Sequence, residues 1–138
     1  VKYLTSYTKK QLGLTMGVSN LIEIFDEKYY DGVKGGILEA FGNIFKNNMK
    51  IYLYPVLDKQ KDTVIDSNNL KLEDNMKEFY KYFKVNDKIR DLEFNKDYLS
   101  IFSKDVLKQI KNKTPGWEDK LPEGVSDLII KKKMFGYK

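Results

Sequence analysis

The stretch Tyr98–Lys138 reads YLSIFSKDVLKQIKNKTPGWEDKLPEGVSDLIIKKKMFGYK and carries the most specific pattern of the chain. Ser103 suits the N-cap of a helix, because a serine hydroxyl accepts hydrogen bonds from the free N–H groups of the first turn. Thr114–Gly116 breaks this helix, and Pro122 suits the first position of a second one. Both helices carry apolar residues at helical spacing, namely Val106, Leu107, Ile110, Val125, Leu128 and Ile129. The stretch therefore predicts two helices, joined by a turn with the only Trp of the chain.

Upstream, the clearest strand is Lys50–Leu57, which is rich in β-branched and aromatic residues. Aliphatic residues alternate with Tyr52 and Tyr54, so one face of the strand is apolar and the other carries tyrosines. Pro55 has no N–H, so we expect the strand to end there or to lie at a sheet edge. Two further strands are predicted, at Thr63–Ile65 and Ile89–Phe94.

Helical periodicity marks three segments around these strands. The apolar positions predict helices at Asn20–Tyr30, Ile37–Lys46 and Asp74–Lys84. Val1–Tyr7 suits a short strand. Leu12–Gly17 has two glycines four residues apart and stays open between a loop and a closely packed segment. Together these elements predict an α/β fold that is helix-rich, with a small sheet, in a single domain over residues 1–138.

The composition supports a folded core and excludes several kinds of chemistry. At 138 residues the chain has the usual length of one domain, and its hydrophobic content of 41% is too high for a disordered chain. It contains neither Cys nor His, which excludes disulfides, thiolate nucleophiles and every Ser-His or Cys-His arrangement. We therefore predict no catalytic residue, metal site or cofactor. The lack of Cys fits the reducing cytoplasm.

The net charge of +5 allows two interpretations. Lysines keep a chain soluble, and a cationic surface also suits a polyanionic partner such as a nucleotide or a nucleic acid. Because the lysines are spread along the whole chain, the first interpretation is favoured, and nucleic acid is not an expected partner. No apolar run approaches the roughly 20 residues that cross a bilayer, so we expect no membrane partner.

The order of residues in Tyr98–Lys138 resembles the carboxyl-terminal part of nicotinate or nicotinamide mononucleotide adenylyltransferases, which belong to the α/β nucleotidyltransferase superfamily. Gly35–Gly42 and Lys50–Pro55 are similar to segments of bacterial proteins of that superfamily. The resemblance implies a Rossmann-like fold and a role in nucleotide or NAD metabolism. The matching positions of the closing stretch are Ile101, Ser103, Ile110, Trp117, Leu121, Pro122, Val125, Ile129 and Phe135–Tyr137.

The chain departs from this family at its phosphate-binding positions. In the family the helix opens with an Ile-Ser-Ser-Thr-type motif, and an Arg three residues after the Thr contacts the ATP phosphates. Here the motif reads Ile101-Phe-Ser-Lys104, and Leu107 stands in place of the Arg. The family's amino-terminal phosphate loop with two His has no counterpart, since the chain lacks His. The resemblance therefore implies a degenerate relative, a carboxyl-terminal fragment, or a subunit whose partner carries the missing half.

A glycine-rich turn before the predicted helix Ile37–Lys46 is the first candidate phosphate site. The backbone N–H groups of Gly35 and Gly36 would point at an anion there, and Lys34 would add a positive charge. An ordinary turn is the alternative, because the turn lacks the Gly-Lys-Ser/Thr ending of a P-loop.

The second candidate phosphate site is the start of the helix after Ile101. The hydroxyl of Ser103 could bind a phosphate, and Lys104 and Lys108 would screen its charge. The alternative is that Ser103 is a plain N-cap.

Aromatic and acidic residues are weaker candidates. Trp117 and Tyr80 could stack on a base, but their spacing favours positions in the core, whereas Tyr52 and Tyr54 suit an exposed partner surface. The series Asp58, Asp62 and Asp66 does not match a calcium loop and is typical of a solvated loop.

From the sequence we expect a nucleotidyltransferase-related domain that binds a nucleotide or another phosphorylated ligand and is not catalytic on its own. Whether the chain is an enzyme stays open at this point. The alternative is a non-enzymatic interaction subunit of a larger assembly, which would bind a protein partner through exposed tyrosines and lysines.

Overall fold

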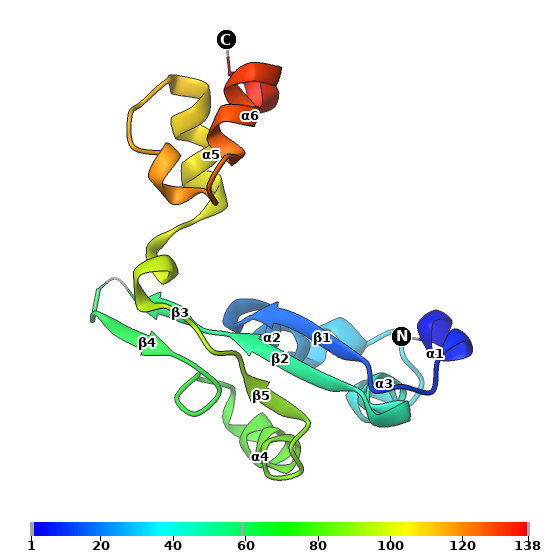
Figure 1. Cartoon of the computed structure of the whole chain (residues 1–138). Helices are drawn as coiled ribbons and strands as arrows, with labels where there is room; N and C mark the ends of the chain where they lie inside the picture. Colours follow the sequence, from blue (N-terminus) through cyan, green and yellow to red (C-terminus); the bar gives the residue numbers. More distant parts are fainter. Residues whose placement is uncertain (1, 59, 138) are drawn as a thin grey trace. The chain divides into compact units, whose positions relative to one another are not determined.

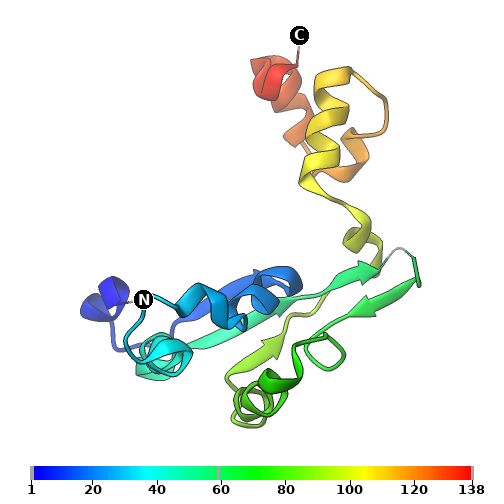
Figure 2. The same cartoon turned by 180° about the vertical axis from the view of Figure 1, so that it is seen from behind.

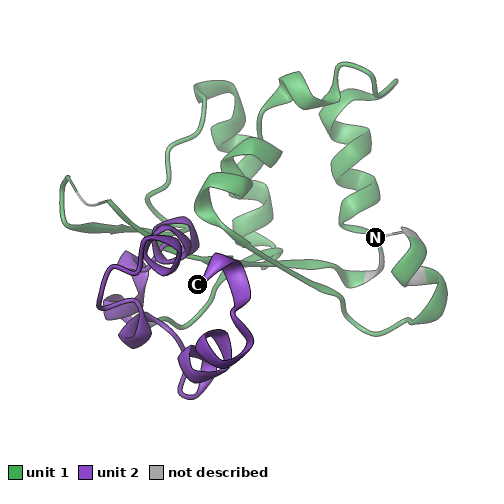
Figure 3. Cartoon of the chain, turned by 90° about the horizontal axis from the view of Figure 1, so that it is seen from above, with its two compact units in different colours: residues 1–94 green, residues 95–138 purple. Residues whose placement is uncertain are grey.

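The computed structural model describes residues 2–58 and 60–137 (Figure 1). The chain divides into two units, residues 1–94 and residues 95–138, which Figure 3 shows in different colours. The single domain over residues 1–138 stays a prediction. Within the described residues, no helix is long and apolar enough to cross a bilayer.

The centre of unit 1 is a parallel sheet of three strands in the order β1-β2-β5 (Figures 1 and 2). The strands are β1 (Gly13–Gly17), β2 (Lys50–Tyr54) and β5 (Ile89–Asp91). Gly13 lies opposite Lys50, and Leu53 lies opposite Asp91. Helices lie along the chain between β1 and β2 and between β4 and β5, so each crossover between parallel strands contains a helix. The α/β prediction and the two predicted strands at Lys50–Leu57 and Ile89–Phe94 are therefore confirmed, with shorter bounds.

Pro55 ends β2, as predicted from its missing N–H, and the chain then continues into a separate two-stranded sheet. In this sheet β3 (Val56–Asp58) pairs with β4 (Thr63–Ile65) in antiparallel orientation. The predicted return strand at Thr63–Ile65 is confirmed.

Three helices pack on one face of the parallel sheet. They are α2 (Val18–Ile24), α3 (Gly36–Ile44) and α4 (Lys77–Val85), with short 3-10 helices at Glu27–Tyr30, Lys46–Asn48 and Asp74–Met76. Ile51, Leu53 and Ile89 of the sheet share one hydrophobic cluster with the buried residues of these helices. At its centre the Phe41 ring lies 4.8 Å from Phe25, 5.0 Å from Phe79 and 5.1 Å from Phe83 between ring centroids.

The amino-terminal predictions need two corrections. The predicted strand at Val1–Tyr7 is wrong for its described part, because Lys2–Tyr7 forms helix α1 and brings the rings of Tyr3 and Tyr7 to 4.9 Å, one turn apart. The loop alternative at Leu12–Gly17 is also wrong, because this segment contains β1. Close packing holds at Gly13, where an added Cβ would stand 2.7 Å from the Tyr52 ring.

Unit 2 is built from the closing stretch of the sequence. Its helices are α5 (Ser103–Asn112) and α6 (Val125–Lys132), with 3-10 helices at Lys96–Ser100, Glu118–Lys120 and Met134–Gly136. Trp117 is 2% exposed and packs with Val106, Ile110 and Ile129, which confirms its predicted core position. The start of the second helix is corrected from Pro122 to Val125, because Gly124 at a φ of 76° turns the chain just before it.

Candidate functional site

The first predicted phosphate site, at the start of α3, is filled by a side chain of the same helix. The N–H of Gly35 donates to Oε2 of Glu39 at 2.8 Å, and the N–H of Gly36 donates to the carbonyl oxygen of Val33 at 2.8 Å. Gly36 has a φ of 60°, which explains the glycine there. Lys34 is exposed beside the turn. A phosphate at this position would have to displace the Glu39 carboxylate, which already neutralises the positive end of the helix.

The second predicted site, at the start of α5, has a different cap from the one expected. Phe102 is the N-cap, and its carbonyl oxygen accepts from the N–H groups of Asp105 at 3.0 Å and Val106 at 3.1 Å. Ser103 is the first helical residue, so the prediction of Ser103 as N-cap is wrong by one position. No side chain caps this helix start. The Ser103 hydroxyl is therefore left for another role.

Ser103 lies in the wall of a groove with a volume of about 530 Å³. Volumes of about 300–1,000 Å³ are usual for small-molecule sites. Two polar residues, Ser103 and Lys120, line the groove, and Nζ of Lys120 donates to Oε1 of Gln109 at 2.9 Å. The remaining lining is apolar and comes from Ile101, Val106, Leu107, Ile110, Leu121, Val125, Ile129 and Phe135.

Lys104 and Lys108 are exposed on α5 and follow directly after two groove-lining residues, Ser103 and Leu107. A helix turns by about 100° per residue, so Lys104 and Lys108 lie about 100° and 140° around the helix from Ser103, outside its groove-lining face. The structure thus brings Ser103, Lys104 and Lys108 together on one helix. Lys34, Gly35 and Gly36 belong to the other unit.

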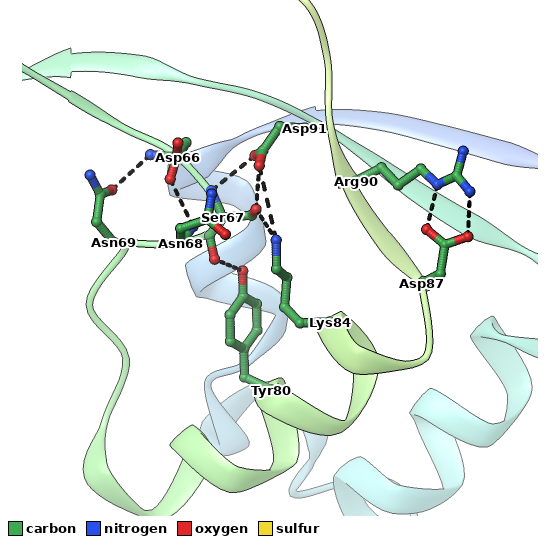
Figure 4. A network of polar contacts seen from close by, with 9 residues as sticks. All are labelled: Asp66, Ser67, Asn68, Asn69, Tyr80, Lys84, Asp87, Arg90 and Asp91. Carbon is green, nitrogen blue, oxygen red and sulfur yellow. Dashed lines mark hydrogen bonds and ion pairs between the residues drawn. The ribbon is translucent and has the colours of Figure 1, made fainter.

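A polar cluster that the sequence did not predict lies at the carboxyl end of β5 (Figure 4). The Ser67 hydroxyl donates to Oδ2 of Asp91 and accepts from Nζ of Lys84. The N–H of Ser67 donates to Oδ1 of Asp91 at 2.9 Å, and the Tyr80 hydroxyl donates to the Ser67 carbonyl oxygen at 2.7 Å. Burial, together with the nearby charge of Asp91, raises the pKa of Tyr80 well above its usual range.

The cluster combines a serine, a lysine and an aspartate, as some catalytic sites do, but its serine is not accessible to a substrate. Ser67 is 2% exposed, and its hydroxyl is bonded to Asp91 and Lys84 on both sides. Nζ of Lys84 also lies 4.0 Å from the Asp91 carboxylate, so all three side chains are engaged with one another. The cluster therefore fixes the turn after β4 to the end of β5.

A second charged group lies at the other end of β5. The Asp87 carboxylate accepts hydrogen bonds from Arg90 and Lys50, which hold the pKa of Asp87 well below its usual range. Lys50 comes from the start of β2, so this group ties two neighbouring strands together.

The remaining candidates have local roles. Tyr54 is 37% exposed and Tyr52 is half-buried over Gly13, so the predicted exposure is confirmed for Tyr54 alone, and the partner surface stays a prediction. Asp58 and Asp66 accept from backbone N–H groups two residues onward, at 3.0 Å and 2.7 Å. In the part of the chain that the structure describes, no three acidic side chains are placed to hold a metal ion.

Comparison with known proteins found no matching family model, curated protein or solved structure.

Proposed function

We propose that this chain is a nucleotidyltransferase-related domain that binds a nucleotide or another phosphorylated ligand in the groove of unit 2. The observation that carries the proposal is Ser103, which is not the N-cap of α5 and lies in the wall of a groove whose lining is apolar apart from Ser103 and Lys120. The proposed role of the chain is in nucleotide or NAD metabolism in the cytoplasm.

Three features of α5 support a phosphate at this end of the groove. The first N–H groups of a helix have no partner within the helix, and the helix dipole places positive potential there. Ser103 adds a hydroxyl donor. Lys104 and Lys108 add positive charge on the exposed sides of the same helix. The apolar walls between Val106 and Phe135 would then hold the less polar part of the ligand, such as a base.

The proposed role is binding without catalysis by this chain alone. The chain lacks the phosphate-contacting Arg of the family that it resembles, because Leu107 stands at that position, and it contains no His. Leu107 itself lines the groove, so the position that would hold the Arg is apolar here.

Thermal unfolding in the presence of ATP, NAD or nicotinamide mononucleotide tests this proposal. We expect at least one of them to raise the Tm of unit 2, because a ligand at about a hundredfold excess over its Kd stabilises by ~2.7 kcal/mol. Ser103→Ala and Lys104→Gln should reduce the shift, and Lys34→Gln, at the start of α3, should leave it unchanged. If none of the three ligands shifts the wild-type Tm at millimolar concentration, the proposal is wrong.

A second candidate function is a non-enzymatic interaction subunit. It is favoured by the apolar lining of the groove and by Phe135, which is 55% exposed beside it. An affinity pull-down with the wild-type chain and with Leu107→Glu separates the two functions. A protein retained by the wild type and lost with Leu107→Glu supports the interaction subunit, and identical retention by both chains contradicts it.

A further inference from the structure

The outer edge of β1 is unpaired among the described strands. In the order β1-β2-β5, β1 pairs with β2 on one side only. The N–H of Lys50 donates to the carbonyl oxygen of Leu12 at 2.9 Å. Residues along a strand alternate in the direction of their backbone groups, so Leu12, Leu14 and Met16 bond to β2. The N–H and C=O groups of Gly13, Thr15 and Gly17 therefore point outward.

Natural proteins usually protect such an edge. Charged residues, prolines and bulges on edge strands prevent another strand from pairing. The sequence of β1 is Gly-Leu-Thr-Met-Gly, which contains no charge and no proline, and its first three residues are exposed. The edge thus has free donors and acceptors and no device against pairing.

We propose that β1 pairs with β1 of a second copy in antiparallel orientation, about a two-fold axis through Thr15. The outward groups are spaced symmetrically about this residue, so Thr15 faces Thr15 of the second copy, and Gly13 faces Gly17. Each of these is a hydrogen-bonded pair that exchanges both N–H···O bonds. The two parallel sheets become one continuous sheet, and the same surface of both copies is used, as a two-fold interface requires.

The side chains of β1 fit the same arrangement. Opposite residues of an antiparallel pair point to the same face, so Leu14 of one copy faces Met16 of the other. Leu14 is 39% exposed in the single chain. Met16 lines a pocket of about 300 Å³, with Asn20, Glu23, Ile24, Tyr29 and Tyr30. Leu14 of the second copy therefore lies against Met16 at this pocket, and the pairing removes Leu14 from water.

The partner strand that we propose is β1 of a second copy, because β1 alone supplies both the matching hydrogen-bonding positions and an apolar side chain beside Met16. Its hydrogen-bonding positions are self-complementary about Thr15, and the residue that projects toward the pocket, Leu14, is supplied by the same strand that carries Met16. No like charges meet across the pair, since the strand carries none.

Cysteine cross-linking tests the register directly, because the chain has no Cys of its own. Cα atoms of a hydrogen-bonded antiparallel pair lie about 5.5 Å apart, inside the range of about 4.4–6.8 Å that a disulfide bridges. We expect Thr15→Cys to form a disulfide-linked dimer under mild oxidation. Thr63→Cys, an exposed threonine in the paired strand β4, is the matched control and should stay monomeric. Equal rates of cross-linking in both variants would overturn the proposal.

The oligomeric state of the unmodified full chain gives the second test. Light scattering with size-exclusion chromatography should show a dimer whose fraction grows with concentration, and a monomer at every concentration would overturn the proposal. Thr15→Pro removes an outward N–H from each copy and should weaken the dimer roughly tenfold to a hundredfold, whereas Thr15→Val keeps this donor and should leave it unchanged.

Leu14→Glu is an independent variant that leaves the backbone untouched. It should weaken the dimer by placing a carboxylate against Met16 of the other copy, in a pocket that Glu23 also lines, and Leu14→Met is its control. A dimer of unchanged affinity in both Thr15→Pro and Leu14→Glu contradicts the proposed interface.

Discussion

The two units of this chain build their cores in different ways. In unit 1 many rings from three helices pack on one face of a sheet, and Phe41 touches Phe25, Phe79 and Phe83. In unit 2 the core cluster consists of three buried residues, Val106, Ile110 and Ile129, around Trp117, and a groove runs beside them. In unit 1 the stability of the core therefore depends on many ring contacts. In unit 2 it depends mainly on one side chain, Trp117, and the small core leaves room for a ligand beside it.

The largest effect is expected for Trp117→Ala. The change removes the biggest side chain of the smaller core, and truncations of this kind cost about 3–5 kcal/mol. We expect α5 and α6 to lose protection in hydrogen exchange measured by mass spectrometry, while α4 in unit 1 keeps its protection. Trp117→Phe, which retains a ring, is the control. Equal loss of protection in both units would contradict the separation of the two cores.

The next effect concerns the polar cluster of unit 1. Asp91→Ala leaves the N–H and the hydroxyl of Ser67 without their acceptor, and each buried unsatisfied group costs about 1–3 kcal/mol. Asp91→Asn keeps an acceptor oxygen and should cost less. Urea unfolding followed by circular dichroism measures both. If the two variants unfold at the same midpoint as the wild type, the cluster does not stabilise unit 1.

A smaller effect is expected for Phe41→Leu. The aliphatic side chain fills most of the same volume, and the neighbouring rings remain, so the cost should stay below ~1.5 kcal/mol. The same urea experiment applies, with Phe41→Ala as the reference for a true cavity. A cost for Phe41→Leu that matches Phe41→Ala would mean that the ring contacts of unit 1 are as concentrated as those around Trp117.

The smallest effect is expected at Asp87, whose charged form is favoured by Arg90 and Lys50. A carboxyl group with a folded-state pKa below its unfolded value of about 3.9 contributes stability above that pH, and the contribution fades as the pH falls through the folded-state pKa. Asp87→Asn should therefore lower the urea midpoint at neutral pH, and the difference from wild type should shrink in acid. A difference that is constant with pH would rule out this ionic contribution.

Much of the fold could be predicted because its signals are local. The alternation in Lys50–Tyr54 and the missing N–H of Pro55 located β2 and its end, and helical spacing located α3, α4 and α5. β1 escaped prediction because a glycine-bounded segment of five residues with one β-branched residue has little intrinsic strand preference. Its conformation comes from pairing with β2, which lies far along the sequence.

The candidate sites show the same limit. The run Asp66–Asn69 is typical of a turn, and nothing local indicated that Ser67 would meet Asp91, which lies 24 residues away. At α3 the glycines were found, but the Glu39 carboxylate that accepts from the Gly35 N–H was not foreseen, although it stands only four residues after Gly35. Ser103 was predicted in the correct helix, but as its N-cap, whereas it is the first helical residue.

The burial of the single Trp in unit 2 makes the chain its own spectroscopic reporter. Excitation at the red edge of the indole band would make emission report on unit 2 alone, because every other aromatic residue is Tyr or Phe. Tyr137 lies 6.0 Å from the Trp117 ring, close enough to transfer its excitation to the indole. Loss of that transfer would mark the opening of unit 2, and a change in indole emission would reveal a ligand entering the groove beside it.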